Sequence, residues 1–151
     1  MKGTLWLAAL LVLAAAAEEP QPDDRAKRET AVRQALDAFW PAFLRGDATR
    51  LRERVDLPLL LLEPGADGGR RLVITAAGWT AFRQGLPTVP LTEDEVTAQV
   101  ANLRLEWLDD QTCFAVYDLQ AVVKRQGVQG HFLTVFGWAD GWKVTVSSIP
   151  G

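Results

Sequence analysis

The first strong pattern along the chain is helical. Between residues 25 and 45, apolar side chains recur at intervals of four, three and four residues, with polar side chains between them. The apolar positions are Val32, Leu36, Phe39 and Phe43. This spacing places them on one face of an α-helix, which we expect to be buried. Pro41 lies within the pattern and is expected to kink the last turn, because proline lacks the N–H group that the helix needs.

Turn-forming residues end this helix and divide the next segment. Gly46 is expected to cap the helix C-terminus, and Asp47 to cap a second, short helix over residues 48–54, whose arginines predict a solvated face. A buried strand over 59–63, a glycine-rich turn over 64–69 and a returning strand over 71–74 are predicted to follow.

A third helix is predicted after this hairpin. Thr75 can cap it, Trp79 and Phe82 share one of its faces, and Gly85 and Pro87 stop it. Further on, Thr92 and Glu95 have the spacing of a capping box, which predicts one more helical turn.

The last third of the sequence alternates between apolar and polar positions with the period of two that is typical of β-strands. The predicted strands cover residues 103–107, 115–123, 132–138 and 142–146, joined by turns at 109–110, 127–130 and 140–141. Helices and one hairpin therefore precede a four-stranded antiparallel meander. This order indicates an α+β fold in which about three helices pack on one face of a curved antiparallel sheet.

The N-terminus has a different pattern, that of a signal peptide. Lys2 precedes an uncharged stretch of mostly Leu and Ala, and Ala15 and Ala17 supply the small residues that signal peptidase recognises. The stretch is shorter than the about 20 residues that span a bilayer. We therefore expect a signal peptide over 1–17, a disordered lead-in over 18–27 and one domain over 28–151. Cleavage near Ala17 would export the protein to the periplasm or the exterior, with no membrane contact afterwards.

Composition narrows the range of partners. The formal net charge is −3, and an acidic chain is a poor candidate for nucleic-acid binding. Cys113, the only cysteine, cannot form an internal disulfide and lies in an apolar strand pattern, so we expect an inert buried thiol. One histidine and one cysteine do not make a cluster of metal ligands, and neither a metal nor a cofactor is expected.

Three short segments make the chain resemble the nuclear transport factor 2-like superfamily, in particular its SnoaL-like branch. They are Ala38-Phe39-Trp40, Arg45-Gly46-Asp47-Ala48 and Asp140-Gly141-Trp142-Lys143-Val144. The resemblance covers about residues 28–148. It implies a cone-shaped, cystatin-like curved sheet closed by helices around a pocket. The family includes isomerases, dehydratases, cyclases, epoxide hydrolases and domains without known chemistry, so the resemblance implies no single function.

Few ionisable residues could act inside such a pocket. Steroid-isomerase-like members pair an Asp base with Tyr and acid donors, and dehydratase-like members need paired histidines. Here Tyr117 is the only tyrosine and His131 the only histidine. The polar candidates are Asp56, Glu63, Tyr117, Asp118, Gln120 and His131. The sequence therefore shows no evident catalytic constellation.

The strand pattern predicts which face or edge of the sheet carries several of these candidates. Tyr117 is expected to point inward as a core aromatic residue, while Asp118 and Gln120 lie on the opposite strand face. His131 is expected at a strand edge. Asp56 could act as a base, or it could form a cap or pair with Arg52.

Three hypotheses follow. The first is an exported domain that binds a small apolar or aromatic molecule without turnover. Its candidate pocket residues are Phe39, Phe43, Trp79, Tyr117, His131 and Trp142. The second is an isomerase, dehydratase or hydrolase that uses Tyr117, His131 or Asp56, which two polar groups meeting in a cavity would favour. The third is a dimeric interaction module, which a filled interior would favour.

A homodimer is also expected from the strand around Tyr117. Its outer face carries Phe114, Val116 and Val122, and a contiguous exposed apolar patch usually marks a contact surface.

Overall fold

The computed structural model describes residues 22–150, so the predicted signal peptide over 1–17 lies outside the described residues. The chain divides into two units, one up to Thr30 and one from Ala31 onward. The first contributes the start of helix α2 (Pro22–Arg45), where Arg25 and Glu29 form an ion pair of 3.4 Å. Because α2 begins at Pro22, residues 22–27 are helical, and the predicted lead-in is wrong for that part.

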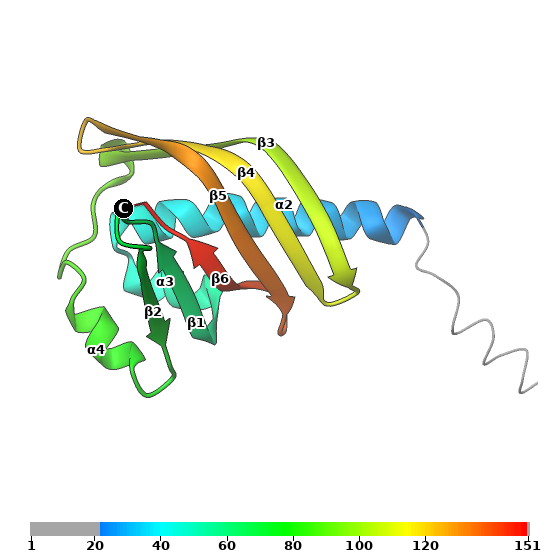
Figure 1. The fold of residues 1–151 in the computed structure, drawn as a ribbon, viewed down its shortest axis with the longest axis horizontal. Helices are drawn as coiled ribbons and strands as arrows, with labels where there is room; N and C mark the ends of the chain where they lie inside the picture. The colour runs from blue at the N-terminus through cyan, green and yellow to red at the C-terminus, as the bar shows by residue number, and fades with distance from the viewer. Residues whose placement is uncertain (1–21, 151) are drawn as a thin grey trace, which may run out of the picture. The chain divides into compact units, whose positions relative to one another are not determined.

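The second unit contains a six-stranded mixed sheet with helices in its N-terminal half (Figure 1). After α2 come α3 (Ala48–Arg54), β1 (Val55–Glu63), β2 (Arg70–Ile74), α4 (Trp79–Gln84), η1 (Glu93–Glu95), β3 (Val96–Asp109), β4 (Thr112–Val123), β5 (Gln126–Trp138) and β6 (Trp142–Ser148). The strand order is β2-β1-β6-β5-β4-β3. The α+β fold with a curved sheet is confirmed. The sheet is not purely antiparallel, however, because β6 runs parallel to β1.

The core lies between α2 and the inner face of the sheet. Val32, Leu36 and Phe39 are fully buried, and Phe43 is partly buried against the same cluster. The sheet contributes alternate residues such as Tyr117 and Phe136, as the period of two requires. The helical stripe predicted from the sequence is therefore the core-facing side of α2. Among the described residues, no helix is both long and apolar enough to cross a membrane.

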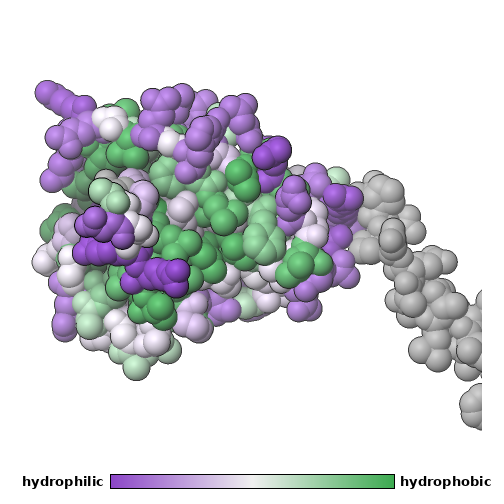
Figure 2. Space-filling view, in the orientation of Figure 1, coloured by the Kyte–Doolittle hydropathy of each residue, from purple (hydrophilic) through white to green (hydrophobic). Residues whose placement is uncertain are grey.

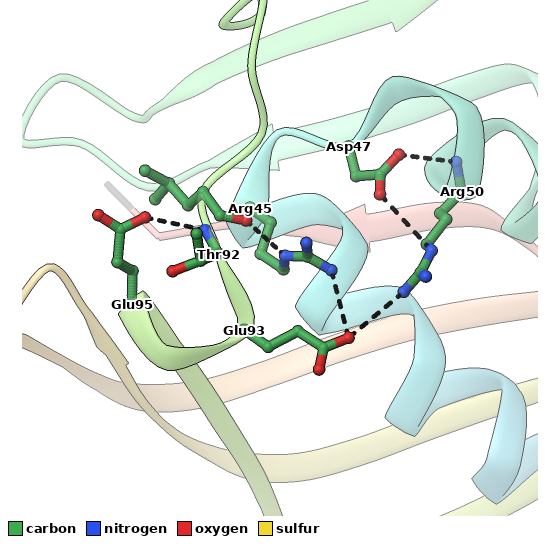
Figure 3. A network of polar contacts seen from close by, with 7 residues as sticks. Arg45, Asp47, Arg50, Thr92, Glu93 and Glu95 are labelled. Atoms are coloured by element: carbon green, nitrogen blue, oxygen red, sulfur yellow. Dashed lines mark hydrogen bonds and ion pairs between the residues drawn. The ribbon is translucent and has the colours of Figure 1, made fainter.

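The joint between α2 and α3 forms as the sequence predicts. Gly46 adopts a positive φ of 68°, and the side chain of Asp47 accepts a hydrogen bond of 3.1 Å from the backbone N–H of Arg50. Figure 3 shows that Glu93, from η1, lies between the guanidinium groups of Arg45 and Arg50 at 4.0 and 3.9 Å. These contacts tie the loop before β3 to the helical joint.

Two elements differ from the sequence prediction because a bulge changes the strand phase. β3 begins at Val96 rather than near Leu103, and its pairing with β4 shifts between Ala101 and Arg104, where Asn102 has a φ of 53°. The bulge moves the inward-facing positions of β3 from even to odd residue numbers. The alternation in the sequence therefore changes phase at Asn102, and the pattern predicted only the second half of the strand. A second shift, between Val135 and Phe136, places Ser147 rather than Val146 in the core.

The turn predicted over residues 127–130 is also wrong. Lys124 and Arg125, with φ values of 49° and 68°, form the two-residue turn between β4 and β5. Two successive positive φ values match the twist of a hairpin, and here two non-glycine residues adopt them. Gly127 and Gly130 therefore lie inside β5.

Two smaller boundaries also move. β1 begins at Val55 rather than at Leu59. The N-cap of α4 is Gly78 rather than Thr75, whose hydroxyl instead accepts a hydrogen bond of 3.0 Å from the N–H of Gly78. The capping box predicted for Thr92 and Glu95 is present at η1.

Candidate functional site

A chain of hydrogen bonds runs through the core. Trp40 Nε1 donates to the phenolic oxygen of Tyr117 at 2.8 Å, and this oxygen lies 2.7 Å from Oγ1 of Thr134. Thr134 Oγ1 lies 2.9 Å from Oγ of Ser147, whose hydroxyl donates to the carbonyl of Ser148 at 2.9 Å. Since the Ser147 proton is used there, Thr134 donates to Ser147 and Tyr117 donates to Thr134. The chain therefore has one direction, and it satisfies four buried side chains.

This chain defines the state of Tyr117. Burial raises the pKa of Tyr117 to about 12, although the hydrogen bond that Trp40 donates to the phenolic oxygen partly opposes the rise. The phenol is therefore neutral at physiological pH, and its single proton is held by Thr134. Tyr117 lies inward as predicted, but its hydroxyl binds side chains rather than the backbone.

The other aromatic candidates for the pocket pack against aromatic neighbours in the hydrophobic core. Phe39 packs on Trp40 and Phe43, with ring centroids 5.3 and 5.7 Å away. Trp142 contacts Trp107 and Trp138, each at 5.4 Å.

Trp79 is partly buried against the same hydrophobic core. Its ring packs against Phe82 at 5.3 Å, and the guanidinium of Arg52 lies 5.7 Å from the ring centroid. The six candidate residues thus do not line one common cavity.

His131 lies on the outer face of the sheet, beside Asp118. Asn102 Nδ2 donates a 2.7 Å hydrogen bond to one oxygen of Asp118, and the other oxygen contacts Nδ1 of His131. The hydrogen bond from Asn102, followed by the nearby His131, lowers the pKa of Asp118. The His131 side chain is 88% exposed, so this is a solvated, oriented imidazole rather than a group in a dry cavity.

The remaining acidic candidates are Glu63 and Asp56. Glu63 binds Arg70 across the β1–β2 hairpin, with Arg70 Nε 2.9 Å from its carboxylate. Arg52 donates to the carbonyl of Val55, and no ion pair with Asp56 is present among the described residues. Within residues 22–150, no group of three or more potential metal ligands comes together.

The sheet opens into a pocket where β5 and β6 separate. β6 pairs with β5 only between Thr134 and Trp138, and its continuation follows β1, where Ile149 N–H donates to the Leu62 carbonyl at 2.9 Å. The gap holds an open pocket of about 680 Å³. It lies beside the end of the β1–β2 hairpin, the first half of β5 and the segment after β6 (upper left in Figure 1).

The lining of this pocket combines apolar and charged groups. Leu62, Val128, Phe132 and Ile149 provide apolar surface, while Glu63, Arg70, Arg71 and His131 lie around them. His131 is thus the only one of the six candidate residues in this lining. Two smaller pockets, of about 580 and 440 Å³, lie beside α3 and are lined mainly by polar residues.

Sequence reasoning missed the residues that join distant strands. Thr134 lies on β5, but its partners Tyr117 and Ser147 belong to two other strands. The only local signals were the Ser147-Ser148 pair within an apolar strand and the Arg70-Arg71 pair beside a glycine-rich turn. Neither pair of residues indicates which strand of the sheet is its neighbour.

No family model and no curated protein matches the sequence. Solved structures do match, at low sequence identity. An NTF-2 like protein of unknown function from Shewanella oneidensis MR-1 is 14% identical, with a TM-score of 0.59, over 82% of this chain and 99% of its own. The association domain of C. elegans CaMKII is 16% identical, with a TM-score of 0.61, over 85% and 98%.

A ketosteroid isomerase-like protein from Erwinia carotovora atroseptica is 14% identical, with a TM-score of 0.52, over 80% of this chain and 93% of its own. At these identities the matches speak for the fold and not for an activity. Each of them covers at least 80% of this chain. The chain therefore has the nuclear transport factor 2-like fold.

Proposed function

We propose that this domain is a non-catalytic binding module whose ligand occupies the pocket between β5 and the β1–β2 hairpin. The observation that carries the proposal is an open pocket of about 680 Å³ that combines apolar walls with a basic rim. Small-ligand sites commonly have this combination of apolar lining and a few polar groups. The ligand would be small and mostly apolar, with one acidic group.

The energetics of such a ligand follow from the lining. Contact with Leu62, Phe132 and Ile149 would remove apolar surface from water, at about 25 cal/mol per Å². Arg71 is exposed and has no ion-pair partner among the described residues, whereas Arg70 is neutralised by Glu63. Arg71 is therefore the cation available to an acidic group.

The state of the ionisable groups favours binding without turnover. Tyr117 is neutral and its proton is held by Thr134. Asp118 has a lowered pKa, and a carboxylate of lowered pKa is a weak general base. The module would thus recognise its ligand rather than transform it.

A titration with 1-anilinonaphthalene-8-sulfonate, an aromatic anion, tests this proposal. We expect a saturable fluorescence rise with one site per chain. Arg71→Gln should weaken binding about two- to fivefold, the range for an exposed charge pair of about 0.5–1 kcal/mol. Arg104→Gln is the matched control, because Arg104 is also an exposed strand arginine and lines none of the three pockets. Absence of binding, or equal loss in both variants, would refute the proposal.

A second function, self-association, is favoured by the outer face of the sheet. A row of cross-strand neighbours on that face is apolar over five strands: Val73, Leu60, Val146, Val135 and Phe114. Figure 2 shows apolar surface over the central strands, on the face turned toward the viewer. Large apolar patches of this kind mark contact surfaces. We infer that two copies pair through this face.

Light scattering over a range of protein concentrations tests the pairing. Val135→Lys, at the centre of the row, should convert a dimer to a monomer without unfolding it. Gln120→Lys, an exposed change on the same face of β4, should leave the dimer intact. A wild-type protein that stays monomeric would rule out this second function.

We also propose that the module acts after export, as the pattern over residues 1–17 predicts. N-terminal sequencing of the protein from its native host should begin at or near Glu18. A soluble cytoplasmic product that keeps residues 1–17 would contradict export.

A further inference from the structure

We propose that the first half of β5 is a docking edge for an extended peptide segment that carries an acidic group. The peptide would lie in the pocket and pair with β5 as an added strand. This inference names the ligand class of the pocket and rests on the proposed binding function.

The direction of the backbone groups in β5 is set by its two neighbours. Ser148 Oγ lies 2.9 Å from the N–H of Leu133 and 3.3 Å from its carbonyl, so both groups of Leu133 point toward β6. The pairing of β5 with β4 has no register shift from Gln126 to Gly137. Backbone groups therefore alternate regularly along β5, and those of Gly127, Gln129 and His131 point to the same side as those of Leu133.

These three residues have no backbone partner on that side within the part of the chain that the structure describes. β6 pairs with β5 only from Thr134 onward, and within residues 22–150 no loop or side-chain hydrogen bond reaches the N–H or C=O groups of Gly127, Gln129 or His131. The same three residues line the pocket. The pocket wall is thus a row of unused donors and acceptors about 13 Å long, at about 3.3 Å per residue.

This edge lacks the features that usually prevent strand addition. Natural edge strands are short, charged or bulged, because an unpaired edge is a template for another strand. At one border of the sheet, β2 is five residues long and begins with two arginines. At the other, β3 carries Arg104 and Glu106 and a bulge at Asn102. In contrast, the run from Gln126 to Gly130 has no charged residue and no proline.

The glycines of this run leave room for a second backbone. A side chain added at Gly127 would meet no atom within 4 Å, and Gly130 contributes no side chain between Val128 and Phe132. Glycine inside a strand often marks a site where another backbone approaches closely. Arg71 borders the same pocket and is the cation that would face an acidic side chain of the peptide.

Peptide recognition by strand addition uses main-chain hydrogen bonds for affinity and alternate side chains for specificity. The pocket offers both. The unused groups of β5 would bind the peptide backbone, and Val128, Phe132 and Ile149 would contact side chains on the inner side.

Amide hydrogen exchange and NMR titration with the peptide Ac-TVTVE-NH₂ test the proposal. In the free protein the amides of Gly127, Gln129 and His131 should exchange fast, while those of Val128, Gly130 and Phe132, which pair with β4, should be protected. The peptide should protect and shift the first set and leave the second nearly unchanged. The same peptide with N-methylated amides is the control and should not bind.

Gln129→Pro removes an N–H that points toward the pocket and leaves the hydrogen bonds between β5 and β4 in place. It should weaken peptide binding about tenfold. Arg71→Gln is the second variant, because it leaves the backbone of β5 intact. It should still bind the peptide and should lose only the preference for Ac-TVTVE-NH₂ over Ac-TVTVQ-NH₂. Should Gln129→Pro fail to fold, the alternating exchange pattern of the wild type decides.

The outcomes separate the two proposals. Binding of the naphthalene sulfonate without peptide binding, or equal binding of the N-methylated peptide, would overturn strand addition and leave the binding function standing. Failure of both probes would overturn both. Strand addition by a peptide would also be overturned if the protein dimerised without peptide and Gln129→Pro abolished the dimer. The edge of β5 would then bind a second copy of this chain.

Discussion

The indole Nε1 of Trp40 donates a 2.8 Å hydrogen bond to the phenolic oxygen of Tyr117, although 77 positions separate the two residues in the sequence. The bond joins α2 to β4 in the middle of the core. It also begins the polar chain that ends at Ser148.

Removing the Tyr117 hydroxyl should therefore destabilise the fold more than the loss of one average hydrogen bond. Tyr117→Phe leaves Trp40 Nε1 without its acceptor and Thr134 without its donor, both in the core, at a cost of about 1–3 kcal/mol. Urea unfolding measures this. In a double-mutant cycle with Trp40→Phe the two losses should not add, because both variants break the same bond. Simple additivity would show that the contact carries no coupling energy.

Ionisation of Tyr117 should destabilise the folded protein at strongly alkaline pH. The pKa of Tyr117 is about 12 in the folded state and 10.0 in the reference state, so the unfolded chain releases this proton first. The stabilising contribution is complete below about pH 10 and is lost as the pH rises through 12, at about 1.4 kcal/mol per pH unit.

Ultraviolet difference absorbance measures this titration directly, because Tyr117 is the only tyrosine in the sequence. The tyrosinate signal should have a midpoint near 12 in the native protein. In the urea-unfolded chain the midpoint should move to about 10. Equal midpoints in the two states would contradict the burial of this phenol.

The apolar stripe of α2 should contribute unequally to stability. Phe39 is fully buried and Phe43 only partly, so Phe39→Ala should cost about 3–5 kcal/mol and Phe43→Ala less. Arg33→Ala, an exposed change on the same helix, should stay within about 0.5 kcal/mol. Urea titration of the three variants checks this order, and similar losses for Phe39 and Arg33 would show that the wrong face had been assigned.

The cap of α3 should also be measurable. Asp47→Ala removes the acceptor for the Arg50 N–H and should destabilise by about 1 kcal/mol. Asp47→Asn keeps a side-chain oxygen at the cap and is the matched control, with a loss well below that of alanine. If asparagine and alanine cost the same, the ion pair of Asp47 with Arg50, and not the cap, supplies the stability.

Local patterns predicted much of the secondary structure and failed at identifiable places. The spacing of Val32, Leu36 and Phe39 identified the buried face of α2, since residues three and four apart share a helix face. The turn at Lys124 and Arg125 was missed because two bulky residues adopt positive φ where glycine is the usual signal. The start of β3 was missed because the bulge at Asn102 interrupts the alternation.

The candidate site was less accessible to the sequence. The inward direction of Tyr117 followed from strand alternation, whereas its partners Trp40 and Thr134 did not. The six aromatic and polar candidates were grouped by the expectation of a single pocket. The structure instead places Phe39, Tyr117 and Trp142 in one filled hydrophobic core, packs Phe43 and Trp79 against it, and leaves His131 on the outer face.

The sequence by itself determined the features that depend on near neighbours: the faces of α2 and β4, the caps at Asp47 and Thr92, and the hairpin at Asp140 and Gly141. Helix periodicity, strand alternation and turn dihedrals are properties of a few consecutive residues. Only the tertiary structure decided that β6 lies between β1 and β5 and leaves β5 before Phe132. Any strand offers its backbone groups to either side, so which of them stay unpaired depends on the strands that fold alongside it.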